Sequence, residues 1–205
     1  MRKQLLFAIL MMPIVLPAQS LNKPLPDFSA TGISGKNWTN KDLLGKVTLI
    51  NFWYIGCLPC MSEAPYLSAL KDSISDKNFQ LISFAKNNKD DLETFLTGKS
   101  DNKDQTVAIL RSAFSLKINY EVIPGCQFGT VTKPAKNDCE YINRTIGITT
   151  FPTTLIIDKK GIVRYIKTGF VKSGEIGSDK KLKTDPKTNK YVSELENEIY
   201  LLLNE

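Results

Sequence analysis

An almost uninterrupted apolar stretch at residues 47–54 constrains the fold of this chain more than any other feature. Its sequence, VTLINFWY, is rich in β-branched and aromatic residues, and a Cys-Leu-Pro-Cys unit follows at residues 57–60. Such a run is typical of a central strand that is covered on both faces. Beyond Cys57 the apolar residues recur every three or four positions, which predicts an amphipathic helix: Met61, Ala64, Leu67, Leu70 and Ile74. We therefore expect a buried strand to lead into a helix at the cysteine pair.

The remaining pattern alternates strands and helices. Beyond the first pair we expect short strands near Phe28 and Trp38, one helical turn at 39–44, a strand at 79–85, a helix at 90–96 and strands at 155–157 and 162–166. The last two strands flank an Asp-Lys-Lys-Gly turn, which indicates a hairpin. Pro65 predicts a kink in the helix that follows the cysteines. This order predicts an α/β fold with a mixed central sheet flanked by helices.

A final helix is expected at the C-terminus. Residues 172–190 are rich in Lys, Gly, Ser and Asp, which predicts a mobile polar excursion before it. Ser193 and Glu196 have the spacing of a capping box, which predicts that the helix begins there. Leu195, Ile199 and Leu202 then share one apolar face.

Composition excludes several classes of function. The chain has 205 residues, 42% of them apolar, which suits one domain with modest extensions. Its 27 basic and 21 acidic residues are intermixed, so neither a nucleic-acid-binding stripe nor a nucleic-acid partner is indicated. The sequence contains no histidine, which excludes Ser-His-Asp and Cys-His catalysis and His-ligated zinc. We therefore expect chemistry from cysteines, carboxylates, lysines or hydroxyls, with no cofactor and no metal.

The first twenty residues resemble a signal peptide. Arg2 and Lys3 precede an apolar stretch at 5–16, and small residues suit cleavage near 18–20. The stretch is too short for an ordinary membrane span, although an uncleaved anchor is the alternative. We expect residues 21–205 to form one exported domain, periplasmic or otherwise extracytoplasmic. In such a compartment the four cysteines can form two disulfides with three possible connectivities, which the sequence leaves open.

The Cys57–Cys60 unit is the candidate reactive centre. A cysteine at a helix N-terminus is favoured as a thiolate, because backbone N–H groups and the positive helix end lower its pKa. Cys57 is then the nucleophile that attacks a partner disulfide, and Cys60 the thiol that resolves the mixed disulfide. An inert disulfide, half of a zinc site and a copper-carrier site are the alternatives. The short ring, the different spacing of Cys126 and Cys139, and the lack of histidine speak against them.

Two blocks of sequence resemble one family. The first is Pro26-Asp27-Phe28, Gly35-Lys36, Leu43-Leu44-Gly45-Lys46-Val47, Asn51-Phe52-Trp53, Cys57-Leu58-Pro59-Cys60 and Glu63-x-Pro65; the second is GITTFPTTLIIDKKG at 147–161. Together they resemble the TlpA/ResA-type extracytoplasmic thioredoxins of the AhpC/TSA–thioredoxin superfamily. The resemblance implies a thioredoxin fold with an N-terminal β extension, and thiol–disulfide exchange. It also implies a cis Phe151–Pro152 peptide opposite the cysteine pair.

The resemblance also implies roles for individual residues. Glu63 would lie beneath the disulfide and move protons, and half-burial would raise its pKa, especially beside the neutral Asn51. The alternative is a solvent-facing Glu in the first turn of a helix. Catalysis would then rest on Cys57, Cys60, Glu63 and Pro152, and a client chain would contact Trp53, Gly56, Leu58, Pro59 and Phe151. Gly56 and Leu58 depart from the residues usual in the family, and these departures leave the reduction potential and the substrate preference open.

The second cysteine pair falls within an insertion at about 124–140. We expect a structural Cys126–Cys139 disulfide, which would contribute about 3 kcal/mol by closing a loop of that length. The alternative is a second redox pair that relays electrons to Cys57–Cys60.

The function expected from these features is that of an exported thiol-disulfide oxidoreductase of reductase type. Its partners would be disulfide-bearing clients, such as apocytochromes, and a membrane thiol electron donor. One alternative is a binding module that kept the fold without the activity. Another is a thiol peroxidase, which lacks support because no Pro-x-x-x-Thr/Ser-x-x-Cys motif is present.

Overall fold

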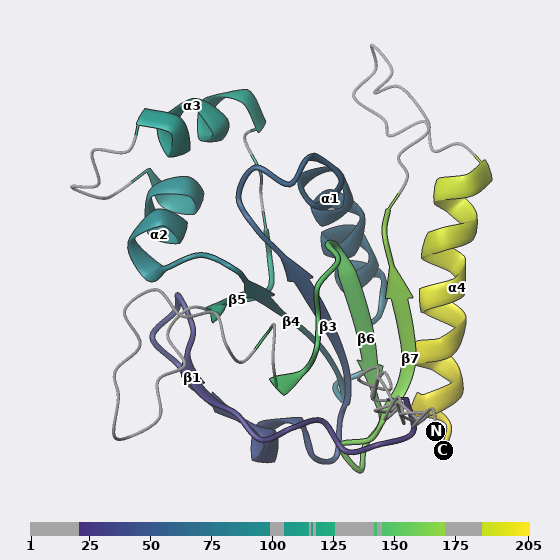
Figure 1. Cartoon of the computed structure of the whole chain (residues 1–205). Coiled ribbons are helices and arrows are strands. Elements are labelled where there is room, and N and C mark those ends of the chain that lie inside the picture. Colours follow the sequence, from purple (N-terminus) through teal and green to yellow (C-terminus); the bar gives the residue numbers. More distant parts are fainter. Residues whose placement is uncertain are drawn as a thin grey trace, which may run out of the picture.

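A mixed sheet of five strands forms the centre of the computed structural model (Figure 1). The structure describes residues 21–98, 105–114, 116, 118–125, 142, 145–170 and 186–205. The strands lie in the order β5-β4-β3-β6-β7: Glu121–Pro124, Phe79–Ala85, Val47–Trp53, Thr153–Ile157 and Val163–Thr168. The pairs β3–β4 and β4–β5 are parallel, whereas β3–β6 and β6–β7 are antiparallel.

The central strand β3 is buried along its whole length. Successive side chains of a strand point to opposite faces of a sheet, and those of β3 enter different apolar clusters. Val47 and Leu49 pack among residues of α1 (Leu58–Ser73) and α4 (Pro186–Leu203), while Ile50 and Phe52 pack on the opposite side. A strand covered on both faces needs apolar residues at nearly every position, which explains the run at 47–54.

Helices cover one face of the sheet and one of its ends. In Figure 1, α1 and the C-terminal helix α4 lie along the sheet, while α2 (Lys89–Thr97) and α3 (Gln105–Phe114) lie together beyond one end of β4. Residues of α2 and α3 pack in the same apolar cluster as both cysteines. Among the described residues, no helix is both long enough and apolar enough to cross a bilayer.

The opposite face is covered by the N-terminal segment. A hairpin of β1 (Ser29–Thr31) and β2 (Asn37–Thr39) leads into a short 3-10 helix, Asn40–Leu43. Leu25 and Phe28 of this segment are buried against the sheet, and the ring of Phe28 meets that of Phe84 at 5.3 Å between centroids.

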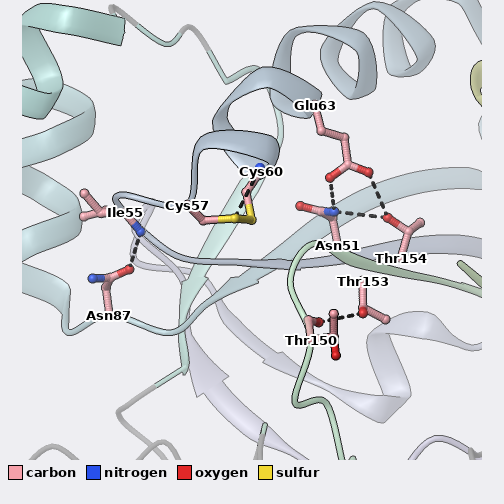
Figure 2. Close-up of a disulfide and its surroundings, with 9 residues drawn as sticks. All are labelled: Asn51, Ile55, Cys57, Cys60, Glu63, Asn87, Thr150, Thr153 and Thr154. Carbon is pink, nitrogen blue, oxygen red and sulfur yellow. Dashed lines mark hydrogen bonds between the residues drawn. A yellow bond between two sulfur atoms is a disulfide. The ribbon is translucent and has the colours of Figure 1, made fainter. Parts of the chain in front are cut away.

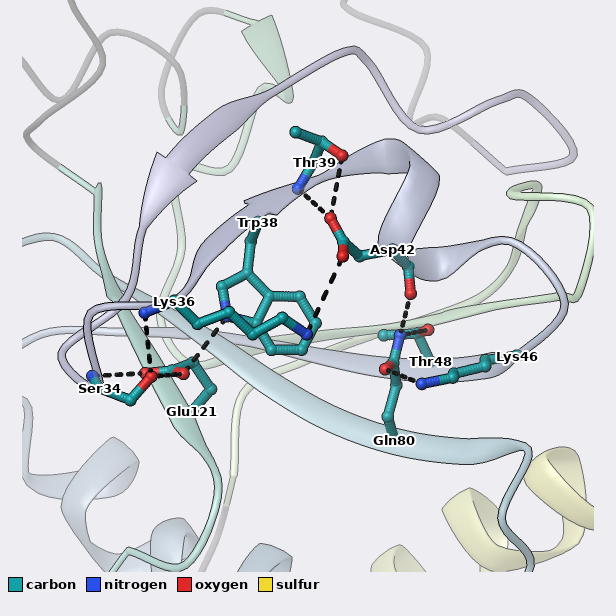
Figure 3. Close-up of polar contacts among 9 residues, drawn as sticks. All are labelled: Ser34, Lys36, Trp38, Thr39, Asp42, Lys46, Thr48, Gln80 and Glu121. Atoms are coloured by element: carbon teal, nitrogen blue, oxygen red, sulfur yellow. Dashed lines mark hydrogen bonds and ion pairs between the residues drawn. The ribbon is translucent and has the colours of Figure 1, made fainter.

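Polar contacts fix this N-terminal extension to the strands beneath it (Figure 3). The Glu121 carboxylate accepts hydrogen bonds from the Ser34 backbone at 3.1 Å and from the Trp38 indole at 3.3 Å. The Gln80 amide donates to the backbone carbonyl of Asp42 at 3.0 Å and to Thr48 Oγ1 at 2.9 Å. The extension is therefore joined to β4 and β5 by side-chain hydrogen bonds as well as by apolar packing.

The predicted α/β fold is confirmed, and the strands expected at 47–54, 79–85 and in the hairpin are present. The sequence did not predict α3 or β5. The proposed capping box was wrong, because α4 already begins at Pro186 and Ser193 and Glu196 lie inside it. Residues 186–190 of the predicted polar excursion are likewise helical. Pro65 lies within α1 and does not end it.

Other boundaries lie outside the described residues. These are the signal segment at 1–20, nearly all of the insertion at about 124–140 and residues 171–185. The division of the chain at residue 20 therefore stays a prediction.

We expect Leu195→Ala to destabilise the fold strongly, because Leu195 is fully buried between α4 and the sheet. The free energy of unfolding should fall by about 2–5 kcal/mol, measured by urea unfolding of the oxidised protein. Leu201→Ala, at a residue of the same helix that is 63% exposed, is the matched control and should change it by less than about 0.5 kcal/mol. Equal effects of the two substitutions would contradict the described packing of α4.

Candidate active site

The two cysteines form a disulfide at the first turn of α1 (Figure 2). Cys57 caps the helix N-terminus, and its Sγ accepts a hydrogen bond from the backbone N–H of Cys60 at 3.3 Å. Only 4% of Cys57 and 2% of Cys60 is exposed. After reduction the same N–H group and the positive end of α1 would favour a thiolate at Cys57, whereas the apolar surroundings would oppose it.

An exposed rim surrounds the cysteine pair. Tyr54, Gly56, Leu58 and Pro59 are all exposed, and Leu58 is 58% exposed. Gly56 has φ +95°, a conformation that residues with a side chain rarely adopt. A side chain at this position would point toward Leu110 of α3. The structure thus places three of the predicted client-contacting residues, Gly56, Leu58 and Pro59, on the surface beside the sulfurs.

Trp53 lies beneath this surface. It is only 2% exposed, and its indole N–H donates to Ser83 Oγ at 3.2 Å. Trp53 packs in the apolar cluster that contains both cysteines and has almost no surface that a client could reach, which speaks against the client contact predicted for it.

The Phe151–Pro152 peptide is cis, as the family resemblance implied. The Phe151 ring packs against the apolar cluster that contains both cysteines and meets the Tyr54 ring edge-on at 5.5 Å. Two hydrogen bonds hold the loop: Gly169 N–H donates to the Pro152 carbonyl at 2.8 Å, and Thr153 Oγ1 to the Thr150 carbonyl at 2.8 Å. Phe151 therefore places this loop at the rim of the cysteine pair.

Glu63 is completely buried, one turn beyond Cys60 on α1. Figure 2 shows its carboxyl pointing toward Asn51 of β3 and Thr154 of β6. Asn51 Nδ2 donates to Oε2 at 2.9 Å, and Thr154 Oγ1 to Oε1 at 3.4 Å. The Tyr191 hydroxyl of α4 also donates to Oε1. The burial is deeper than the half-buried position expected from the sequence, and the solvent-facing alternative is wrong.

Burial raises the pKa of Glu63 to about 7, and the hydrogen bonds from Tyr191, Asn51 and Thr154 partly oppose that rise. Burial is also the main cause of the raised pKa values of the Tyr120 and Tyr191 phenols, and the charge of Glu63 raises both further. A carboxyl with a pKa near neutrality can take up and release protons at physiological pH.

Thr154 and Tyr191 were not predicted as part of the site. Thr154 lies opposite Asn51 in the β3–β6 register, and a polar side chain in a buried strand was a signal that could have indicated it. No comparable signal existed for Tyr191, because it is 128 residues from Glu63 and falls just after the stretch interpreted as a polar excursion.

Cys126 and Cys139 lie outside the described residues, so their disulfide stays a prediction. Within the part of the chain that the structure describes, no three Cys, Asp or Glu side chains gather as a metal site would require.

The AhpC/TSA family model matches residues 21–166, which is more than half of the chain. The chain belongs to the AhpC/TSA family. This AhpC/TSA protein is 26% identical over 151 residues to the thioredoxin-like protein YneN of Bacillus subtilis, covering 74% of this chain and 73% of YneN. It is 26% identical over 148 residues to the thiol-disulfide oxidoreductase ResA of Bacillus thuringiensis, covering 72% and 69%. These relatives confirm the resemblance seen in the sequence.

A solved structure supports the thioredoxin fold of this AhpC/TSA protein. The thioredoxin domain of a thiol-disulfide oxidoreductase from Bacteroides vulgatus superimposes with a TM-score of 0.51 at 16% identity, covering 86% of this chain and 98% of that one. At this level of identity the likeness concerns the fold.

Replacing Glu63 with Gln should remove a pH dependence of stability. Because the folded-state pKa of about 7 lies above the ordinary value of 4.5, the folded chain binds this proton more tightly than the unfolded chain. The resulting stabilisation is complete below the unfolded-state pKa and is lost as pH rises through the folded-state pKa. Between about pH 5 and about pH 8 the wild-type free energy of unfolding should fall by about 2–3 kcal/mol relative to Glu63→Gln.

Urea unfolding of the oxidised protein across this pH range measures the difference. Glu205→Gln, at an exposed carboxyl, is the control and should follow the wild type. Parallel curves for wild type and Glu63→Gln would contradict the buried, near-neutral carboxyl.

Proposed function

We propose that this protein is a thiol-disulfide oxidoreductase whose Cys57–Cys60 pair exchanges electrons with disulfides of other proteins, acting as a reductase. One observation carries the proposal: a buried carboxyl with a pKa of about 7 lies on the helix that begins at the disulfide. A structural disulfide needs no proton carrier beneath it. An exchanging pair does, because its resolving thiol must lose a proton before it can attack.

In the reduced protein the Cys57 thiolate attacks a client disulfide. A Cys57–client bond forms, and one client sulfur leaves as a thiolate that takes a proton. Glu63, in its ionised form, accepts the proton of the Cys60 thiol, directly or through one water. The Cys60 thiolate then attacks Cys57 Sγ, which forms the Cys57–Cys60 disulfide and releases the second client thiolate. Two electrons have passed to the client, and a dithiol donor must reduce the pair again.

The surface around the pair suits a protein client. Leu58, Pro59 and Tyr54 offer exposed apolar contacts, and the partly exposed Phe151 lies beside Tyr54. An extended segment of a client could add main-chain hydrogen bonds there, as peptides do at other exposed strands. Pro152 would then shape the groove from the buried side.

Export and partners follow from the sequence. The signal-type segment at 1–20 supports export of the domain from the cytoplasm to a compartment where client disulfides form. We propose disulfide-bearing proteins such as apocytochromes as the clients, and a thiol protein of the membrane as the electron donor. The name of ResA as a thiol-disulfide oxidoreductase supports the reaction class.

A redox titration with alkylation mapping tests this function. We expect Cys57 to alkylate faster than Cys60 after reduction, because its sulfur accepts the helix N–H and is therefore favoured as a thiolate. The Cys57–Cys60 pair should open at a milder potential than any Cys126–Cys139 disulfide. Cys57→Ser should abolish reduction of a disulfide peptide, whereas the double variant Cys126→Ser/Cys139→Ser, as the control, should retain it.

Exchange activity that survives Cys57→Ser would refute the proposed reaction. A wild-type protein that binds disulfide peptides without reducing them would instead indicate a binding module. Rapid peroxide consumption that depends on one cysteine alone would indicate a thiol peroxidase.

A further inference from the structure

The C-terminal helix contributes a polar side chain to the buried carboxyl site. Tyr191 of α4 is 8% exposed, and its ring packs edge-on against Phe170 at 5.2 Å between centroids. Its hydroxyl donates to Glu63 Oε1 and lies 3.5 Å from Thr154 Oγ1. Four elements, α1, β3, β6 and α4, thus meet in one hydrogen-bonded cluster.

We propose that Tyr191 is a positioning residue whose hydroxyl holds the Glu63 carboxylate in the orientation from which it accepts the proton of Cys60. The proposal rests on the proposed exchange function. It assigns to the last helix, far along the chain from the cysteine motif, a part in the proton step.

The division of hydrogen bonds on the carboxyl supports this role. Asn51 Nδ2 donates hydrogen bonds to Glu63 Oε2 at 2.9 Å and to Thr154 Oγ1 at 3.1 Å. Thr154 makes a longer bond of 3.4 Å to Oε1. Tyr191 is the second donor to Oε1. Without it, that oxygen would keep one long bond in a site closed to water, and the carboxyl could turn about its bond to the side chain.

The same hydroxyl affects the protonation of Glu63. A donor bonded to the charged form favours that form, so Tyr191 lowers the pKa of Glu63 against the effect of burial. Loss of the hydroxyl should therefore raise the pKa of Glu63 further, because one of the hydrogen bonds that counteract the effect of burial is gone. Ionised Glu63, the form that accepts the proton, would then predominate only at higher pH.

Within the described part of the chain, the other titratable groups near the cluster are phenols and the two cysteines. Tyr120, before β5, is buried and interacts electrostatically with Glu63, and the cysteine pair lies on α1 itself. Tyr165 of β7 interacts with Tyr191, but its own hydroxyl lies 3.5 Å from Glu194 at the surface. Glu194 pairs there with Lys167 at 2.8 Å. In the oxidised protein the disulfide-bonded cysteines do not titrate, so a transition of the Glu63 resonance near neutrality reports the carboxyl.

Tyr191→Phe tests the role because it removes the hydroxyl and keeps the ring that packs on Phe170. Tyr200→Phe makes the same chemical change at an exposed residue of the same helix and is the matched control. Two readouts are compared: the 13C resonance of the Glu63 carboxyl in the oxidised protein, assigned by its loss in Glu63→Gln, and the pH profile of disulfide-peptide reduction.

In Tyr191→Phe we expect the carboxyl to titrate about one pH unit higher, a roughly tenfold change in proton affinity. The acid limb of the activity profile should move upward by a similar amount, so that activity falls below neutral pH and recovers at alkaline pH. Tyr200→Phe should leave both unchanged. In a Glu63→Gln background, Tyr191→Phe should have no further effect on the profile.

An unchanged carboxyl titration in Tyr191→Phe, with normal wild-type exchange, overturns the role of Tyr191 and leaves the proposed function standing. A uniform loss of activity in Tyr191→Phe, without movement of the pH profile, would show a merely structural role and would also overturn the proposed role of Tyr191. A wild-type protein without exchange activity refutes the proposed function, while the carboxyl titration still decides whether Tyr191 controls Glu63.

Discussion

The burial of one carboxyl on the helix that begins at the disulfide is the constraint on which the site depends. Glu63 has no exposed surface, and a charge in such a position is costly unless hydrogen bonds compensate for the lost water. The chain supplies donors from β3, β6 and α4, none of which carries a positive charge. The carboxyl is therefore neither fixed as an anion nor excluded from ionising, and its pKa of about 7 allows it to exchange a proton near neutrality.

The sheet register and the helix α1 together bring the reacting groups into one place. Asn51 and Thr154 are opposite each other in the β3–β6 pair, on the face that α1 covers. After β3 the chain turns at the exposed Gly56, and Cys57 caps the start of α1. One strand and one helix therefore place the disulfide just inside the exposed rim and the carboxyl in the interior. Helix α4 closes the site from the side.

Much of this site could be predicted from residues near each other in the sequence. The apolar run, the Cys-x-x-Cys unit and Glu63 three residues later lie within seventeen positions of one another, and local periodicity relates strand to helix. Tyr191 could not be found in this way, because its partner is distant in the sequence and α4 begins at Pro186, before the predicted capping box. Strand β5 was also missed, because a strand of only four residues shows little periodicity in the sequence. Helix α3 was missed as well. Trp53 looked like part of the surface because it neighbours the motif, yet the pleat of β3 directs it inward.

The rate at which Cys60 resolves a preformed Cys57 mixed disulfide, followed as a function of pH, tests the central claim most directly. Because ionised Glu63 accepts the Cys60 proton, the wild-type rate should rise with pH through a single ionisation near pH 7. In Glu63→Gln that ionisation should vanish, and the rate near neutrality should fall by about 10²-fold. A Glu63→Gln protein that keeps both the wild-type rate and the wild-type profile would show that the buried carboxyl takes no part in the exchange.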